Sequence, residues 1–275
     1  MAQHDAAGMR VTGMMLRDKV AVITGIGPGL GRALALLAVQ EGATIAICAR
    51  TAEKLNALEH DILALTPDAR VLRQTTDVSD RDQARAFVDA VATRFGRIDV
   101  LINSAYTTGA YQLAAEADLD DWRRTLDVNL FGSMNMIQAT VPHMRAGGGG
   151  SIVNINTKVS RMPLETMGGY AVSKAALRMA TAQLAKELGG DHIRLNSIFP
   201  GWMWGTTVEQ GMVERAKLQG TTVAALRAEI EKAIPLGAIP TDSECAKAVI
   251  ALSSDYFSAV TGACLDLSAG EYMPV

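Results

Sequence analysis

Cysteine is scarce in this chain of 275 residues, which contains only Cys48, Cys245 and Cys264. The three lie far apart, their number is odd and no C-x-x-C pair occurs, so the sequence predicts neither a disulfide framework nor a zinc site. None of the four histidines stands at metal-ligand spacing from another, and we expect no bound metal.

An excess of basic residues is also absent, because 26 Lys and Arg oppose 29 Asp and Glu and give a net charge of -3. Without a basic stripe, the sequence predicts no nucleic-acid partner. No apolar run approaches the ~18 residues of a membrane-spanning helix, so no membrane association is expected. Residues 1–17 lack the continuous apolar core of a secretory signal, and we expect a cytoplasmic protein whose residues 1–14 form a flexible tail.

What is present is a regular alternation of short apolar, β-branched runs with longer helical patterns. Strands that are apolar throughout, each followed by a helix, are typical of a parallel sheet covered on both faces. We expect strands at residues 20–24, 44–49, 70–76, 98–103, 151–156, 193–199 and 263–267. The predicted fold class is α/β: a single-domain, Rossmann-type, doubly wound parallel sheet of about seven strands over residues 15–275.

Helix ends are predicted from capping residues and breakers. Ser79-x-x-Asp82 resembles a capping box for a helix that closes at Gly96, and Thr241-x-x-Glu244 resembles another for a late helix. A long helix is expected over residues 118–141, ended by Pro142 and the glycines that follow. Other helices are expected at 30–41, 51–65 and 169–188.

Residues 201–237 fit neither a strand nor a simple crossover helix. We interpret them as an insertion that forms a helical substrate-binding lobe, with helices at 208–217 and 223–233.

A glycine-rich turn follows the first strand and opens directly into a helix. Glycines let the backbone approach a pyrophosphate closely, and the helix N-terminus offers free N–H groups and a partial positive charge. This strand-turn-helix context predicts dinucleotide binding by Thr24, Gly25, Gly27, Gly29, Leu30 and Gly31.

The end of the second strand favours one cofactor. A carboxylate there would bind the ribose 2′-hydroxyl of NAD, but the chain has Ala49 followed by Arg50 and Thr51. A guanidinium suits a 2′-phosphate, so NADP is predicted, with NAD as the alternative if Arg50 is only a solvated surface residue.

Tyr170 and Lys174 are four residues apart at the start of a predicted helix and therefore share one face. A nearby ammonium lowers the pKa of a phenol, which would make Tyr170 a usable acid and base closer to neutral pH.

Several motifs in order resemble those of the short-chain dehydrogenase/reductase family over residues 16–274. They are Thr24-Gly25-(x)3-Gly29-x-Gly31, Asp77-Val78, Asn103-Ser104-Ala105, Asn129, Tyr170-(x)3-Lys174, Pro200-Gly201 and Thr261-Gly262.

The resemblance implies a role for each matching residue. Tyr170 would donate the proton to a carbonyl, Lys174 would bind the nicotinamide ribose and lower the Tyr170 pKa, and Asn129 would hold a water in a proton relay. Asp77 would hydrogen-bond the adenine amine. The implied cofactor contacts also include Val78, Asn103, Ala105, Pro200 and Gly201.

Two positions depart from the family pattern. The family's serine that stabilises the carbonyl oxygen is replaced by Thr157, which keeps a hydroxyl but adds a methyl group. We expect Thr157 to take that role; the alternatives are donation by Asn156 or weak turnover. Tyr106 stands where glycine is common, and its phenol either overhangs the nicotinamide end or packs under the following loop.

Aromatic residues are absent before Phe87, so the predicted adenine half is built from aliphatic side chains and glycine. Tyr106, Trp202 and Trp204 fall on the substrate side, where they suggest a bulky hydrophobic substrate, although packing of the lobe explains each tryptophan equally well.

The predicted function is an NADP(H)-dependent dehydrogenase or reductase that interconverts a small-molecule carbonyl and a secondary alcohol. The alternatives are a 3-oxoacyl-thioester reductase and a binding protein that senses NADP without turnover. By resemblance alone, we expect a homotetramer or homodimer.

Overall fold

The computed structural model describes residues 14–274, and its centre is one parallel sheet of seven strands in the order β3-β2-β1-β4-β5-β6-β7. The strands are β1 (Val20–Thr24), β2 (Thr44–Ala49), β3 (Val71–Thr75), β4 (Val100–Asn103), β5 (Gly150–Ile155), β6 (Ile193–Pro200) and β7 (Cys264–Leu267). The order of strands reverses between β1 and β4, and a doubly wound sheet binds ligands beyond the carboxyl ends of such a pair. The predicted fold class is confirmed.

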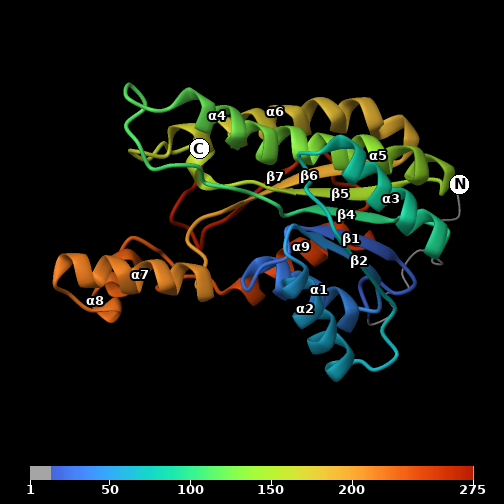
Figure 1. The fold of residues 1–275 in the computed structure, drawn as a ribbon, viewed down its shortest axis with the longest axis horizontal. Helices are drawn as coiled ribbons and strands as arrows, with labels where there is room; N and C mark the ends of the chain where they lie inside the picture. Colours follow the sequence, from blue (N-terminus) through green and yellow to red (C-terminus); the bar gives the residue numbers. More distant parts are fainter. Residues whose placement is uncertain (1–13, 275) are drawn as a thin grey trace, which may run out of the picture.

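Nine α-helices accompany this sheet in the described part of the chain. They are α1 (Leu30–Gln40), α2 (Ala52–Leu65), α3 (Arg81–Phe95), α4 (Leu119–Leu126), α5 (Ser133–Ala146), α6 (Gly168–Leu188), α7 (Thr206–Gln219), α8 (Val223–Glu231) and α9 (Asp242–Ser253). Figure 1 shows α1, α2 and α9 on one face of the sheet, α3, α4, α5 and α6 on the other, and α7 and α8 projecting to one side.

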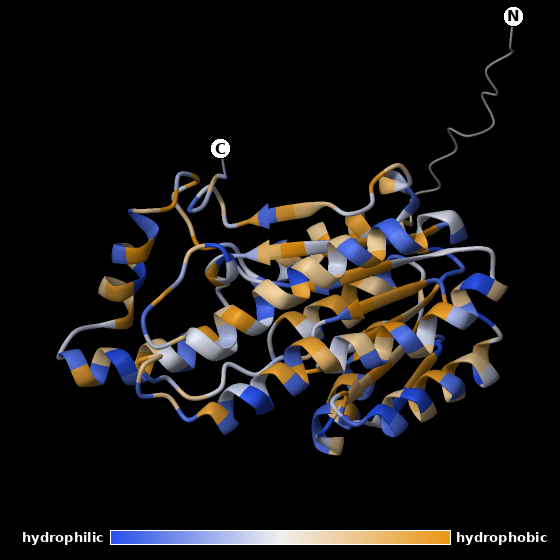
Figure 2. Cartoon of the chain, turned by 90° about the horizontal axis from the view of Figure 1, so that it is seen from above, coloured by the Kyte–Doolittle hydropathy of each residue, from blue (hydrophilic) through white to orange (hydrophobic). Residues whose placement is uncertain are grey.

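Two apolar cores lie on the two faces of the sheet. One joins strand residues such as Ile23 and Ile45 to α1 and α9, and the other joins Val22 and Leu101 to α3 and α5. Successive side chains of a strand point to opposite faces, so strands buried on both faces are apolar throughout. The hydrophobic strands are visible between the helices in Figure 2.

The predicted helix over 118–141 is wrong in its interior and at its end. Asp118 caps α4, whose last residue is Leu126; a π-helical segment, Asp127–Gly132, follows and leads into α5. Pro142 lies inside α5 and does not end it. An interior proline loses its N–H bond and crowds the carbonyl of the residue four positions earlier, but its fixed φ is compatible with a helix. α5 continues past Pro142 to the glycines that begin at Gly147.

Two predicted caps had different outcomes. α3 is capped by Asp80, whose carboxylate accepts the N–H groups of Asp82 and Gln83 at 3.0 Å, and not by Ser79. The Ser79 hydroxyl is engaged elsewhere, because it donates to Asp77 Oδ1 at 2.6 Å. The capping box of Thr241 and Glu244 at α9 is confirmed.

The segment 201–237 contains α7 and α8, close to the two helices predicted there. It starts where β6 ends, so the lobe stands at the carboxyl edge of the sheet. The predicted tail, 1–14, lies outside the described residues apart from Met14. In residues 14–274, no helix combines the length and the apolar character needed to cross a bilayer.

Candidate active site at the carboxyl edge of the sheet

The glycine-rich turn between β1 and α1 brings two backbone segments into close contact. Gly25 has φ of +75°, and a Cβ there would lie 2.4 Å from the backbone of Ala105; a Cβ at Gly31 would lie 2.5 Å from the Gly25 carbonyl oxygen. Around Gly27 the space is open. No side chain of residues 14–274 caps the N-terminus of α1, so its first N–H groups fit an anionic pyrophosphate.

Thr24, predicted as a cofactor contact, is used inside the protein. Its hydroxyl oxygen accepts the backbone N–H groups of Ser104 and Ala105 at 3.1 and 3.2 Å. The side chain therefore ties the end of β1 to the end of β4 and fixes the walls of the crevice between them.

The residues predicted for the adenosine end follow β2 and β3. Arg50 is exposed beyond β2 and forms no ion pair with residues 14–274, next to the half-buried Thr51. Asp77 follows β3 and its Oδ1 accepts Ser79 N–H at 3.0 Å. Val78 is buried and would contact a Cβ at Gly132.

Thr157 and Tyr170 meet beyond the end of β5. Thr157 is 7% exposed and precedes a short 3-10 turn, and Tyr170 lies in the first turn of α6. Burial and the neighbouring Tyr106 raise the pKa of Tyr170, while a hydrogen bond with Thr157 lowers it; the raised direction prevails. Asn156 is buried, and its side chain has no hydrogen-bond partner within residues 14–274. Of these two neighbours, Thr157 is the one that influences the pKa of Tyr170.

Lys174 lies one helical turn after Tyr170 and is only 2% exposed. Its Nζ donates to the Ile155 carbonyl oxygen at 2.7 Å, and burial lowers the pKa of Lys174 to about 7. From the sequence we expected the Lys174 ammonium to lower the pKa of Tyr170. Burial of the phenol is the largest influence on the pKa of Tyr170 and raises it, so the predicted lowering by Lys174 stays a prediction.

Asn129 occupies the π-helical segment and is fully buried. Its amide exchanges two hydrogen bonds with the backbone of Thr107, both 2.8 Å, and donates a third to Ser173 Oγ at 2.9 Å. π-Helical turns place an additional residue in a helix and often occur at functional sites. Ser173 was missed from the sequence, although it lies between Tyr170 and Lys174.

A row of buried polar side chains crosses β4, β5 and β6. Asn103 donates to Asn154 Oδ1 at 2.9 Å, Asn154 donates to Thr181 Oγ1 at 2.9 Å, and Ser197 donates to the same oxygen at 3.1 Å. The pairing register sets Asn103 opposite Asn154 and Asn154 opposite Ser197. The row therefore joins α6 to the three strands that end at the site.

Tyr106 extends from the end of β4 toward Tyr170. The two ring centroids are 6.2 Å apart with an interplanar angle of 49°, and Tyr106 is 53% exposed. Aromatic pairs favour tilted arrangements at such distances. Tyr106 therefore lies beside Tyr170, and the choice between overhanging the nicotinamide end and packing under the following loop stays a prediction.

The lobe has a small core of its own. Trp202 and Trp204 pack against Met212, Ile234 and Ile239, and the Arg227 guanidinium lies 4.4 Å from the Trp204 ring centroid. Both tryptophans are half-buried in this cluster, so packing of the lobe accounts for much of their surface. Pro200 and Gly201 lead from β6 into the lobe.

Asp242 is a further residue that the sequence did not single out. A Cβ at Gly29 would lie 3.2 Å from Asp242 Oδ2, and a Cβ at Gly205 would overlap the same carboxylate. Burial raises the pKa of Asp242. The carboxylate therefore stands between the glycine-rich turn and the start of the lobe, a relation that nothing in the local sequence indicates.

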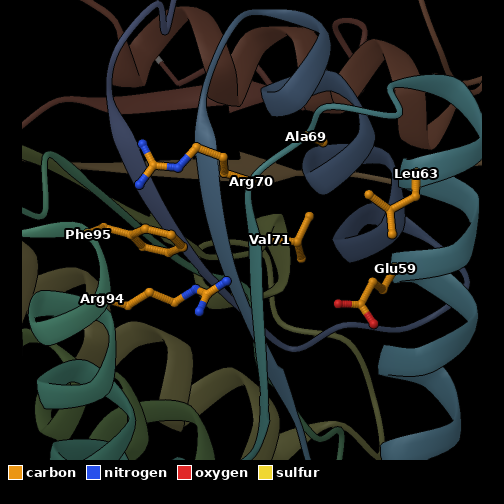
Figure 3. Close-up of a pocket in the computed structure, with 7 residues that line it drawn as sticks. All are labelled: Glu59, Leu63, Ala69, Arg70, Val71, Arg94 and Phe95. Carbon is orange, nitrogen blue, oxygen red and sulfur yellow. The ribbon is translucent and has the colours of Figure 1, made fainter.

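A hollow of about 350 Å³ lies elsewhere, beside the edge strand β3. Figure 3 shows its lining side chains, which include Arg70, Arg94, Phe95 and Glu59. Arg70 and Arg94 both stack over the Phe95 ring, so the hollow is lined by surface groups far from Tyr170. The cysteines are free thiols, and residues 14–274 contain no group of three potential metal ligands.

A parallel sheet with a glycine-rich turn at its reversal point and a Thr–Tyr–Lys group beside it defines a dinucleotide-dependent oxidoreductase. Residues 19–217 match the family described as short chain dehydrogenase, and the chain belongs to the short-chain dehydrogenase/reductase family.

Relatives of known name cover almost the whole chain. The chain is 35% identical to 3-oxoacyl-(acyl-carrier-protein) reductase FabG of Thermotoga maritima, over 94% of this chain and 99% of the relative. It is 36% identical to D-threitol dehydrogenase of Mycolicibacterium smegmatis, over 93% of each chain. L-sorbose reductase from Gluconobacter frateurii, solved with NADPH and L-sorbose, matches with a TM-score of 0.90 and 29% identity, over 96% of this chain and all of that one.

Proposed function

We propose that the protein is an NADP(H)-dependent oxidoreductase that interconverts a carbonyl and a secondary alcohol, with Tyr170 as general acid and base. The observation that carries the proposal is the placement of Tyr170 in the first turn of α6, one helical turn before the buried Lys174 and close enough to Thr157 for its hydroxyl to influence the pKa of Tyr170. The family supports NAD(P)-dependent oxidoreduction in general, and the residue roles and NADP preference are our own assignments.

The chain offers a consistent set of groups for the cofactor. The uncapped N-terminus of α1 would hold the pyrophosphate, and the exposed Arg50 beyond β2 would bind the 2′-phosphate. Asp77 and Val78 would contact the adenine; Asn103, Ala105, Pro200 and Gly201 would line the nicotinamide end. When bound, the nicotinamide supplies or accepts the hydride at the substrate carbon.

Protons are handled by the hydroxyl groups at the end of β5. In reduction, the Tyr170 hydroxyl would give its proton to the substrate oxygen while the Thr157 hydroxyl donates a hydrogen bond to the same oxygen. The pKa of Lys174, lowered to about 7, allows this side chain to bind or release a proton near neutral pH, which suits a relay behind Tyr170. Asn129 would position that relay.

A bulky hydrophobic substrate is supported by Tyr106, whose half-exposed ring lies beside Tyr170. Trp202 and Trp204 would contribute only the faces that the lobe core leaves uncovered. Reduction of a 3-oxoacyl thioester is the second candidate, because the Thermotoga maritima relative is a 3-oxoacyl-(acyl-carrier-protein) reductase.

A panel of cyclic and aromatic ketones, short polar ketones, sugars and a 3-oxoacyl thioester, assayed by NADPH oxidation, tests the proposal. Tyr170→Phe should abolish turnover and keep NADPH binding by fluorescence titration. Binding of NADPH with no turnover of any substrate would favour a cofactor-sensing protein instead. A preference for short polar ketones or sugars would contradict the hydrophobic pocket.

Assembly and location stay predictions. A homotetramer or homodimer in the cytoplasm is our expectation, and sedimentation velocity of the purified protein tests the assembly.

A further inference from the structure

Two ion pairs connect the segment after β5 to the C-terminal end of the chain. Lys158 Nζ pairs with Glu271 Oε1, and Arg161 pairs with both carboxylate oxygens of Asp266 at 2.7 Å. All four side chains are at least four-fifths buried, unlike the surface pairs elsewhere, such as Arg32 with Asp61. Separating a buried ion pair leaves each charge without a partner in the protein interior, which is energetically costly, so each pair stays formed.

The Lys158–Glu271 pair lies directly beside the proposed reaction centre. Lys158 follows Thr157 in the chain, and its backbone is fixed because its carbonyl oxygen accepts the N–H groups of Arg161 and Met162, both at 2.8 Å. The Ser160 hydroxyl also donates to the Thr157 carbonyl oxygen at 2.7 Å. A displacement of Lys158 is therefore transmitted to Thr157 through a short, rigid turn.

Glu271 lies in a turn, residues 268–272, that is stabilised by hydrogen bonds between its own residues. Ser268 Oγ accepts the Tyr272 N–H at 3.1 Å, and Glu271 N–H donates to the Ser268 carbonyl oxygen at 3.0 Å. The second oxygen of Glu271 faces Gly201, where a Cβ would lie 2.7 Å from it. Glu271 thus touches both loops that leave the sheet at the site, after β5 and after β6.

We propose that Lys158 and Glu271 are positioning residues: their buried ion pair uses the C-terminal segment to hold the Thr157 hydroxyl in the orientation that the substrate oxygen requires. The inference rests on the proposed role of Thr157. Hydroxyl donors lose much of their effect on a reaction when displaced by about 1 Å, so a tether of this kind acts on kcat more than on KM.

The Arg161–Asp266 pair provides a matched comparison within the same two segments. It has similar burial, and its cation also lies over the Phe199 ring, 3.7 Å from the centroid, but it is three residues further from Thr157. If these buried pairs matter only for stability, Lys158→Met and Arg161→Met should both lower the free energy of unfolding and leave kcat per folded enzyme unchanged. The proposal expects Lys158→Met to lower kcat at least tenfold at unchanged NADPH affinity and Arg161→Met to lower it less. The surface control Arg145→Met, which breaks the exposed pair with Asp191, should leave kcat unchanged.

A double-mutant cycle with Thr157→Val separates positioning from general damage. If Lys158 acts through Thr157, Lys158→Met should lower kcat by less than twofold when it is introduced into the Thr157→Val variant. Lys158→Arg and the reversed pair Lys158→Glu with Glu271→Lys should each recover part of kcat. Additive losses in the cycle would overturn the positioning role.

Hydrogen exchange of the full-length protein tests the ion pair without an assay of turnover. Glu271→Gln should raise exchange at residues 158–162, and Lys158→Met should raise it at residues 268–272. If each variant affects only its own segment, the tether is wrong. If the tether holds but no carbonyl or alcohol is turned over by the wild type, the proposed function fails and the positioning role fails with it.

Discussion

Asn129 in the π-helical segment donates a hydrogen bond of 2.9 Å to the hydroxyl of Ser173 in α6. Ser173 in turn donates to the Tyr170 carbonyl oxygen at 2.8 Å. The first turn of α6 is thereby held against the helix that follows β4, and the Tyr170 side chain is carried by a backbone fixed from two sides.

Substitutions of Thr157 should distinguish the hydroxyl from the methyl group. Thr157→Ser keeps the donor and should stay within about threefold of wild-type kcat/KM, whereas Thr157→Val should lose roughly 10²-fold or more, the usual cost of a lost oxyanion donor. Steady-state kinetics with one ketone measures both. Equal kcat/KM for Thr157→Val and wild type would exclude Thr157 from the mechanism.

The buried Lys174 should make stability depend on pH above neutrality. Burial lowers its pKa from 10.5 to about 7, so between these values the unfolded chain binds a proton that the folded protein has released. The free energy of unfolding should therefore rise with pH in this window, by up to a few kcal/mol, and this group contributes no further change below its folded pKa. Denaturant unfolding of Lys174→Met at several pH values should show a flatter rise, and parallel curves for variant and wild type would contradict the assignment.

Arg50 and Ala49 should decide between the two nicotinamide cofactors. Arg50→Ala removes the proposed partner of the 2′-phosphate and should weaken NADPH binding about tenfold or more, the cost of a lost charge-assisted hydrogen bond, with little effect on NADH. Ala49→Asp should weaken NADPH further by repulsion. Fluorescence titrations with NADPH and NADH measure the dissociation constants. A preference of the wild type for NAD would contradict the assignment of NADP.

Asp242→Asn should tighten NADPH binding. The carboxylate faces Gly29 in the glycine-rich turn, so a bound pyrophosphate would meet a like charge there. We expect a severalfold lower Kd for the variant at pH 8, since one like-charge contact costs about 1 kcal/mol in water. Because burial raises the pKa of Asp242, the wild-type group becomes neutral sooner on acidification than an ordinary carboxyl group, and the difference should close as pH falls. Asp68→Asn, an exposed site far from this turn, serves as the control.

The strands could be predicted almost to the residue because buried parallel strands are apolar throughout and end at glycine or polar residues. Residues 44–49 and 193–199 correspond closely to β2 and β6. The π-helical segment could not be predicted, because its extra residue is stabilised by the contacts of Asn129 with Thr107 and Ser173. Pro142 was predicted to end its helix for a similar reason, because packing of α5, which depends on the fold, outweighs the local cost of a proline.

In the candidate site, local motifs marked Tyr170 and Lys174 as neighbours, and the structure places them one helical turn apart, with Lys174 buried and Tyr170 half-buried. Contacts between distant segments left no comparable signal. Lys158 and Glu271 are 113 residues apart, and Asp242 meets Gly29 only because α9 packs beside α1. Those contacts require the folded sheet, and a single sequence does not contain their distances.

The row of amides and hydroxyls from Asn103 to Ser197 favours a single register of β4, β5 and β6. If β5 slipped by one residue against β4, Asn154 would turn to the opposite face and leave Asn103 and Thr181 without their partner in an apolar core. A misaligned sheet is therefore penalised by stranded polar groups as well as by poor packing. The same row lies beneath the reaction centre and fixes the positions of the ends of β4, β5 and β6 relative to one another. The loops that surround the site start from these three strand ends.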